Sequence, residues 1–280
     1  MREVSVISLK EKVKEMLIKV NYELSDDMKK ALRDARKTET SSVGKNILSQ
    51  LDENMEIARK RQIPICQDTG MAVVFLKAGQ EVHFKDGDVK EAINEGVREA
   101  YEEGYLRKSV VKDPLLRENT KDNTPAVIHF DLIPGDKVKL SVTCKGFGSE
   151  NMSRTYMLKP ADGKEGIVNS VVNTVKEAGP NACPPLVVGV GIGGTFEKAA
   201  LMAKEALLRP VGEHSSLSHM AELEKEILEK INQLDIGPAG LGGNTTALAV
   251  NIESYPTHIA GLPVAVNLCC HVNRHAVCEL

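Results

Sequence analysis

The spacing of apolar residues changes along this chain, and the change limits the folds open to it. Over residues 1–60, apolar side chains recur at steps of three and four, as at Val6, Leu9 and Val13, which gives a helix one apolar face. Between 138 and 143, apolar and polar residues alternate, which is the period of a half-buried strand. The sequence therefore predicts a mixed α/β chain.

We expect one body, residues 1–280, in which a mostly helical N-terminal lobe (1–60) packs on mixed sheets with flanking helices. Ser25 is a candidate N-cap for a helix that begins with two acidic residues. The remaining predicted helices cover 88–104, 165–178, 195–208 and 218–234, and the predicted strands cover 71–76, 184–191, 245–252 and 261–268.

A hairpin is predicted between 126 and 146. Pro134, Gly135 and Asp136 are turn residues, and they stand between two extended runs. The stretch that follows, GFGSEN, is expected to be a flexible polar loop.

Composition excludes several classes of function. A net charge of −3, an aromatic content of 4 % and the absence of Trp argue against nucleic-acid binding. No apolar run reaches the roughly 18 residues of a membrane span, and the N-terminus does not resemble a signal peptide. We expect a cytoplasmic protein that binds neither nucleic acid nor membrane.

Three of the six cysteines stand at predicted element ends. Cys66 and Cys183 each precede a strand, and Cys270 follows one. Three thiolates that converge in the fold would suit an iron–sulfur cluster, whereas buried thiols acting as small hydrophobic side chains are the alternative. For Cys144 and Cys278 the second interpretation is preferred. Cys269 is next to Cys270, and neighbours in a strand point to opposite faces.

A glycine pattern offers a different function. Gly189, Gly191 and Gly194 fit GxGxxG between a strand and a helix, the setting of a dinucleotide site. The acidic residue expected about 20 residues further on is missing. Close packing of strand and helix and an anion site at the helix N-terminus are the alternatives.

Basic residues in the loops suggest an anionic ligand. Arg107, Lys121, Arg154 and Arg274 together could hold a small dicarboxylate, since guanidinium groups bind carboxylates with two hydrogen bonds. His258, by itself, is typical of a structural histidine.

Six motifs occur in an order that resembles the class I fumarate hydratase family, and in particular the α subunit of its two-subunit members. The likeness runs from about residue 10 to the end of the chain. The motifs are PICQDTG, LRENTKDNTPAVIH, GFGSEN, NACPPLVVGVGIGGTFEKAALMAKEAL, DIGPAGLGGNTTALAV and THIAGLPVAVN followed by a cysteine and RHA.

The resemblance implies a [4Fe–4S] hydro-lyase with one open iron. Its cluster ligands would be Cys66, Cys183 and Cys270, the last chosen because the family's cysteine stands four residues before the Arg of RHA. Matching the motifs also implies catalytic roles for Asp68 and His258, and substrate contacts for Gln67, Arg107 and Gly148.

The resemblance further implies a partner and a substrate class. Single-chain relatives supply the base from a second domain, so we expect a separate β subunit and an α2β2 heteromer. The substrate would be a 2-hydroxy dicarboxylate, either malate in equilibrium with fumarate, or tartrate. An NAD-linked oxidoreductase and a noncatalytic binding subunit are the alternatives.

Overall fold

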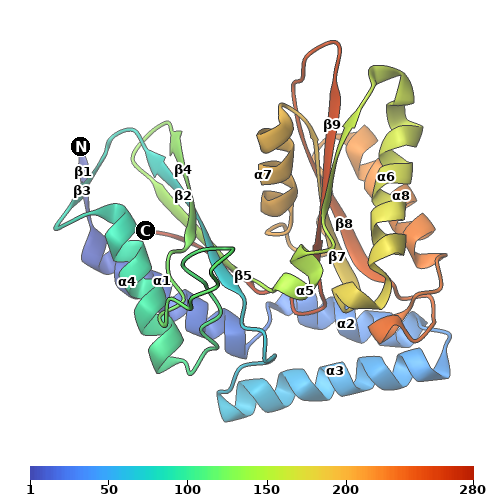
Figure 1. The fold of residues 1–280 in the computed structure, drawn as a ribbon, viewed down its shortest axis with the longest axis horizontal. Coiled ribbons are helices and arrows are strands. Elements are labelled where there is room, and N and C mark those ends of the chain that lie inside the picture. Colours follow the sequence, from blue (N-terminus) through green and yellow to red (C-terminus); the bar gives the residue numbers. More distant parts are fainter. The chain divides into compact units, whose positions relative to one another are not determined.

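The computed structural model describes all 280 residues, and the chain separates into two units (Figure 1). Residues 1–60 are mostly helical, and the helix α3 (Ser42–Arg61) passes from unit 2 into unit 1. None of the helices combines the length and apolar character that a membrane crossing requires. Unit 1 contains Met1–Ser25, Asn54–Gly146 and Arg274–Leu280, and unit 2 contains Asp26–Glu53 and Phe147–Asn273.

Two helices form the base of the core of unit 1. They are α1 (Val6–Tyr22) and α4 (Val89–Glu103). The predicted apolar stripe of α1 is confirmed, because Leu9 and Val13 are fully buried. The helices approach closely at Gly96, where an added Cβ would lie 2.6 Å from the carbonyl oxygen of Lys10.

A four-stranded sheet packs on these helices. Its order is β10 (His275–Glu279), β5 (Val138–Lys145), β2 (Met71–Gly79) and β4 (Val127–Ile133). Alternate residues of β2 and β5 join α1 and α4 in one apolar core. Two short parallel strands, β1 (Arg2–Ser5) and β3 (Val82–Lys85), complete the unit.

The hairpin predicted between 126 and 146 is wrong. β2 lies between its two strands, parallel to β4 and antiparallel to β5. The turn at 134–136 crosses the end of β2, where the N–H of Gly79 donates to the carbonyl of Lys137 at 2.8 Å. The apolar β2 takes the centre because both of its edges are then hydrogen-bonded and both of its faces buried.

Unit 2 is a sheet covered on both faces (Figure 1). Helices α6 (Gly163–Ala178) and α8 (Ser218–Asn232) pack on one face through an apolar core, and α7 (Phe196–Ala206) packs on the other. The strand order is β6 (Arg154–Leu158), β9 (Leu262–Cys269), β7 (Leu186–Gly193) and β8 (Ala247–Tyr255). The remaining elements are α2 (Asp26–Thr38), α5 (Phe147–Glu150) and 3-10 turns at Pro160–Asp162, Gly179–Ala182 and Pro238–Gly240.

The glycines of the GxGxxG pattern serve packing. Gly189 and Gly191 lie inside β7 and face α7, and a Cβ at either would lie 2.1 Å from a carbonyl oxygen of that helix. The alternate residues Val188 and Val190 face α6 and α8. Close packing of strand and helix, one of the three interpretations of the pattern, is therefore confirmed for Gly189 and Gly191.

A buried carboxylate joins α2 to the loop before β8. Glu39 is 1 % exposed, and its Oε1 accepts hydrogen bonds from the N–H groups of Thr40, Ser41 and Asn244 at 2.8–3.1 Å. Its Oε2 accepts from the N–H of Thr245 at 2.9 Å. Burial alone would raise the pKa of Glu39, but these hydrogen bonds outweigh it and hold the pKa below its usual range.

The predicted serine cap of α2 is wrong. The Ser25 hydroxyl is buried and has no hydrogen-bond partner, so it does not satisfy the first turn of the helix. Two acidic residues, Asp26 and Asp27, occupy that turn and favour the positive end of the helix dipole.

Replacing Gly191 by Ala should lower the free energy of unfolding by about 3 kcal/mol, because the new methyl group would collide with the Ala199 carbonyl and force α7 away from β7. Urea unfolding followed by circular dichroism measures this. Gly261→Ala is the matched control, since the nearest atoms to its added Cβ are 4.0 Å away. Equal stability of the two variants would contradict the packing role.

Glu39→Gln should destabilise the protein by about 2–3 kcal/mol at neutral pH, because an amide NH2 cannot accept from backbone N–H groups. The folded-state pKa of Glu39 is lowered, so the carboxylate contributes stability above its unfolded pKa of about 4.5 and loses it as the pH falls below that value. The difference between wild type and variant should therefore shrink towards low pH in urea titrations. A pH-independent difference would argue against this role.

Candidate functional site

The first group of predicted site residues lies in the loop that leads from α3 into β2 in unit 1. Buried side chains hold the carbonyl oxygens of three consecutive residues of this loop. Arg274 Nη1 donates to the carbonyl of Asp68 at 2.7 Å. Tyr101 Oη lies 3.1 Å from the Thr69 carbonyl and 2.8 Å from the Gly70 carbonyl. These hydrogen bonds fix the main chain that carries Cys66, Gln67 and Asp68.

Gly70 allows this loop to lie against the sheet. Its φ is +78°, and an added Cβ would lie 2.8 Å from the main-chain carbonyl carbon of Lys145 in β5. A residue with a side chain would be strained by this backbone conformation and would also collide with β5. The loop can therefore reach the edge of β5 only with glycine here.

Thr69 ties Arg107 to the same loop. The Arg107 N–H donates to Thr69 Oγ1 at 2.9 Å, and Thr69 Oγ1 donates to the Arg107 carbonyl at 3.1 Å. Cys66 is half-buried with its thiol 3.5 Å from Gln67 Oε1, and Arg107 is exposed. Unit 1 thus brings together four predicted residues: Cys66, Gln67, Asp68 and Arg107.

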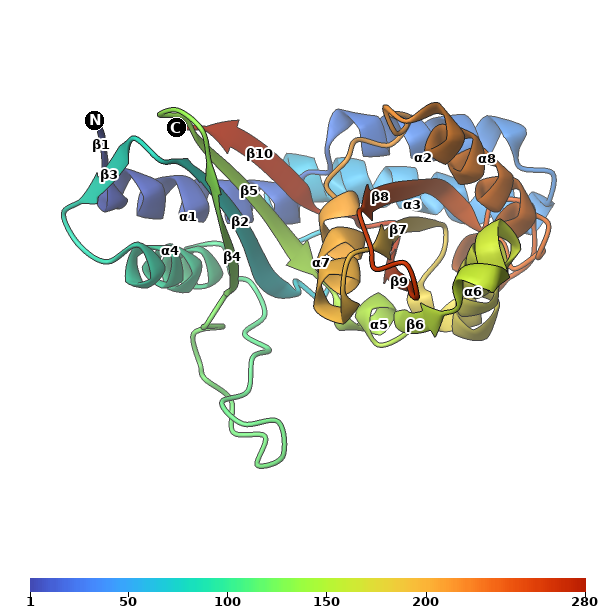
Figure 2. The same cartoon turned by 90° about the horizontal axis from the view of Figure 1, so that it is seen from above.

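Arg107 stands at the start of a long segment that extends from α4 before it enters β4 (Figure 2). Buried Asn123 fixes its base by donating to the Gly70 carbonyl at 3.3 Å and accepting from the N–H of Ser109 at 2.7 Å. Burial alone would raise the pKa of Asp122, but hydrogen bonds from Thr124 and Arg98 outweigh it and lower the pKa to about 2. Both ends of the segment are therefore fixed beside the loop of Cys66.

Unit 2 brings together the other two predicted ligands. Cys183 follows a 3-10 turn, has a φ of +55° and is exposed. Its carbonyl oxygen accepts from the His271 N–H at 3.4 Å and lies 3.1 Å from His271 Nδ1. Cys270 directly precedes His271, so the two cysteine-bearing segments lie side by side. Cys269 is 2 % exposed, whereas Cys270 is half-buried, as alternation at the end of β9 predicts.

Gly148 lies beside the same pair of segments. The expected flexible loop at GFGSEN is instead the short helix α5, and an added Cβ on Gly148 would lie 3.6 Å from the carbonyl oxygen of Asn181. Glu150 holds this helix by accepting from Asn267 Nδ2 at 2.8 Å and by pairing with Lys204. A polar composition predicted a loop, but these contacts stabilise a helical turn.

His258 lies elsewhere in unit 2. It is exposed in the turn between β8 and β9, where its Nδ1 accepts from the Ala260 N–H at 3.2 Å. Cys270 follows the other end of β9, and a strand of that length spans about 26 Å. The fold of unit 2 therefore does not bring His258 to the cysteine pair. A cavity of about 550 Å³ beside it is lined by Lys164 and His219, among others.

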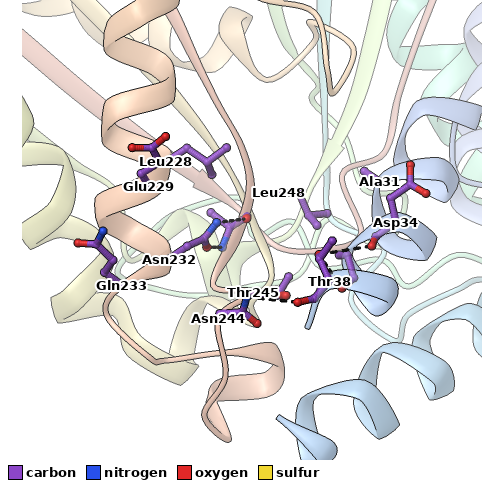
Figure 3. Close-up of a pocket in the computed structure, with 12 residues that line it drawn as sticks. Ala31, Asp34, Thr38, Leu228, Glu229, Asn232, Gln233, Asn244, Thr245 and Leu248 are labelled. Carbon is purple, nitrogen blue, oxygen red and sulfur yellow. Dashed lines mark hydrogen bonds between the residues drawn. The ribbon is translucent and has the colours of Figure 1, made fainter. Parts of the chain in front are cut away.

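A separate cavity of about 620 Å³ lies between α2 and α8 and contains none of the predicted site residues (Figure 3). Asn232 lines this cavity, but its Oδ1 already accepts hydrogen bonds from the N–H groups of Thr246 and Ala247, at 2.9 and 2.8 Å. Volume alone does not make this cavity a catalytic site.

The cysteines fall into two chemical groups, and none forms a disulfide. Burial raises the pKa of the Cys144 thiol and of the Cys278 thiol, which suits inert core thiols. Cys66, Cys183 and Cys270 are each at least partly exposed at element ends. Within either unit no three His, Cys, Asp or Glu side chains form a metal site. The exposed thiols fit an iron–sulfur cluster in chemistry, and their convergence stays a prediction.

Several residues that build the site were not found by sequence reasoning. In the sequence, Tyr101 is one residue of a predicted amphipathic helix. Asn123 is one of many polar residues in a predicted loop. Arg274 was expected to bind a dicarboxylate, but it is 2 % exposed and its Nη1 is already occupied by protein acceptors. The only sequence signal for a role of Arg274 near the site is its position four residues after Cys270.

Known proteins resemble this chain along nearly its whole length. The family model described as fumarate hydratase (fumerase) matches residues 10–279. A Methanocaldococcus jannaschii protein, whose name gives L(+)-tartrate dehydratase subunit alpha as a provisional assignment, is 48 % identical over 260 residues, which is 91 % of each chain. The L(+)-tartrate dehydratase subunit alpha of Escherichia coli K12 is 34 % identical over 274 residues, 96 % of this chain and 90 % of the relative. The chain therefore belongs to the class I fumarate hydratase family of hydro-lyases.

Proposed function

We propose that this chain is the α subunit of a hydro-lyase that dehydrates a 2-hydroxy dicarboxylate with the help of a [4Fe–4S] cluster. The whole chain, 1–280, would act as one α subunit. The observation that carries the proposal is that each unit gathers its own share of the family's motif residues. Thr69 ties Arg107 to the loop of Cys66, and His271 joins the segments of Cys183 and Cys270.

Cys66, Cys183 and Cys270 are the proposed ligands. Partial burial of Cys270, against the 2 % exposure of Cys269, supports the choice between these neighbours. When bound, a [4Fe–4S] cluster with one unfilled iron position supplies a Lewis acid that makes the substrate's hydroxyl a better leaving group.

The residues of the Cys66 loop would bind and orient the substrate. The exposed guanidinium of Arg107 can bind a carboxylate with two hydrogen bonds. The Gln67 amide can donate to a second oxygen, and the Asp68 carboxylate can hold or release a proton. Gly148 leaves room for a ligand to approach the main chain of α5. A catalytic role for His258 stays a prediction.

The names of the relatives support the proposed substrate and partner. They are called L(+)-tartrate dehydratase subunit alpha, so we propose tartrate as the first substrate to test, with malate as the second. We propose a β subunit that supplies the base, in an α2β2 heteromer. Assays of the purified complex with L(+)-tartrate, D-tartrate, L-malate and fumarate, followed by product absorbance, distinguish these substrates.

Replacing any one of Cys66, Cys183 and Cys270 by Ser should lower the bound iron of anaerobically purified protein by about tenfold or more, because the variant lacks a thiolate ligand. Iron and sulfide analysis and absorbance near 400 nm measure the loss. Cys269→Ser and Cys144→Ser are matched controls that should keep the wild-type iron content. Loss of iron in Cys269→Ser but not in Cys270→Ser would reverse the assignment.

The isolated chain should turn over at least about 100-fold more slowly than the complex with its β subunit, because a general base contributes factors of that order. The chain and the co-purified complex are compared at equal iron content, and mass spectrometry checks the chain for residual β subunit. Equal turnover without any β subunit would show that the base belongs to this chain.

A further inference from the structure

Arg274 is a buried cation that contacts the Cys66 loop without being open to a ligand. It is 2 % exposed and directly precedes β10 in unit 1. Its Nη1 donates to Asn21 Oδ1 at 3.0 Å and to the carbonyl oxygen of Asp68 at 2.7 Å. We infer that Arg274 is a positioning residue, which fixes the main chain at Asp68 and thereby aims the side chains of the Cys66–Asp68 segment.

The anchor behind Arg274 is rigid. Asn21, at the end of α1, is fully buried, and its Nδ2 donates to the Leu17 carbonyl at 2.9 Å and to Cys144 Sγ at 3.2 Å. The side-chain amide of Asn21 is therefore fixed by two contacts of its Nδ2, in addition to the hydrogen bond that its Oδ1 accepts from Arg274. A continuous line of contacts runs from α1 through Asn21 and Arg274 to the carbonyl of Asp68.

The side chains of Arg274 and Asp68 also lie beside the same glycine. A Cβ added to Gly146 would lie 3.1 Å from Asp68 Oδ2 and 3.4 Å from Arg274 Nη2, so both groups pack on the same glycine. Lys145 provides a second buried cation nearby and donates to the Gly146 carbonyl at 3.0 Å. The absence of a side chain at Gly146 therefore leaves space for both the carboxylate and the guanidinium.

Burial of the Arg274 charge destabilises the folded state, so its presence in the core indicates a role. Arg274 Nε is buried and has no hydrogen-bond partner, and a buried charge with an unsatisfied donor destabilises the folded state. An apolar side chain could fill the same core without that penalty. Its contacts to Asp68 and Asn21 explain why a guanidinium stands here.

The test is hydrogen–deuterium exchange of the cluster-free chain, read by mass spectrometry on peptides that cover 62–72. Arg274→Gln should speed exchange there by about tenfold, the effect expected from losing a charge-assisted hydrogen bond. Arg274→Lys should lie close to wild type, because its ammonium can still donate to the Asp68 carbonyl. Asn21→Ala should give a smaller increase, and it provides the test if Arg274→Gln does not fold.

The matched control is Arg209→Gln in unit 2, which removes another largely buried arginine that donates to Glu224 at 2.5 Å. It should leave exchange over 62–72 unchanged. Wild-type exchange over 62–72 in the folded Arg274 and Asn21 variants would overturn the inference, and so would an equal increase in Arg209→Gln.

The role of the aimed side chains rests on the proposed function, and the two claims can fail separately. The exchange experiment needs no cluster, substrate or partner. Wild-type complex that binds no iron and dehydrates no diacid would refute the proposed function, while the exchange data would still decide the role of Arg274. In a loaded complex, Arg274→Gln should lower kcat with a smaller change in KM, and Arg274→Lys should restore it.

Discussion

The loop from Cys66 to Gly70 depends on the capture of its carbonyl oxygens by buried side chains. A main-chain carbonyl removed from water must be hydrogen-bonded, and the loop has no strand partner that could do this. The donors are Arg274, which directly precedes β10, Tyr101 from α4, and Asn123 from the segment before β4. The positions of Cys66 and Asp68 are thus determined by residues that lie between positions 101 and 274 of the sequence. Gly70 is the complementary requirement, because only a residue without a side chain can lie against β5.

Unit 2 also fixes the main chain around its predicted site residues, but through different contacts. Glycines inside β7 let α7 pack directly on the sheet, and β9 ends where the segment of Cys183 passes. The contacts between His271 and the Cys183 carbonyl hold the two cysteine-bearing segments side by side. In both units a close main-chain approach at a glycine is combined with a polar contact beside the predicted site residues.

The sequence predicts well what depends on local pattern. The apolar stripe of α1, the strand β2 and the helices α4, α6, α7 and α8 follow from periodicity, because burial of one face determines that pattern. Strand neighbours do not follow from it, since β4 and β5 carry the same pattern whether they pair with each other or with β2. Ser25 was misread because a cap sequence does not ensure a cap hydrogen bond. Arg274 was misread because charge suggests exposure, and only the fold shows that Asn21 and the Asp68 carbonyl lie within its reach.

The central claim is that three distant cysteines of this chain hold one iron–sulfur cluster. Diffraction data collected at the iron absorption edge, from anaerobic crystals of the complex with the β subunit, test it most directly. We expect one anomalous peak with iron bonded to Sγ of Cys66, Cys183 and Cys270. Iron bonded to Cys269 in place of Cys270, or no iron in a complex that still dehydrates its substrate, would contradict the claim.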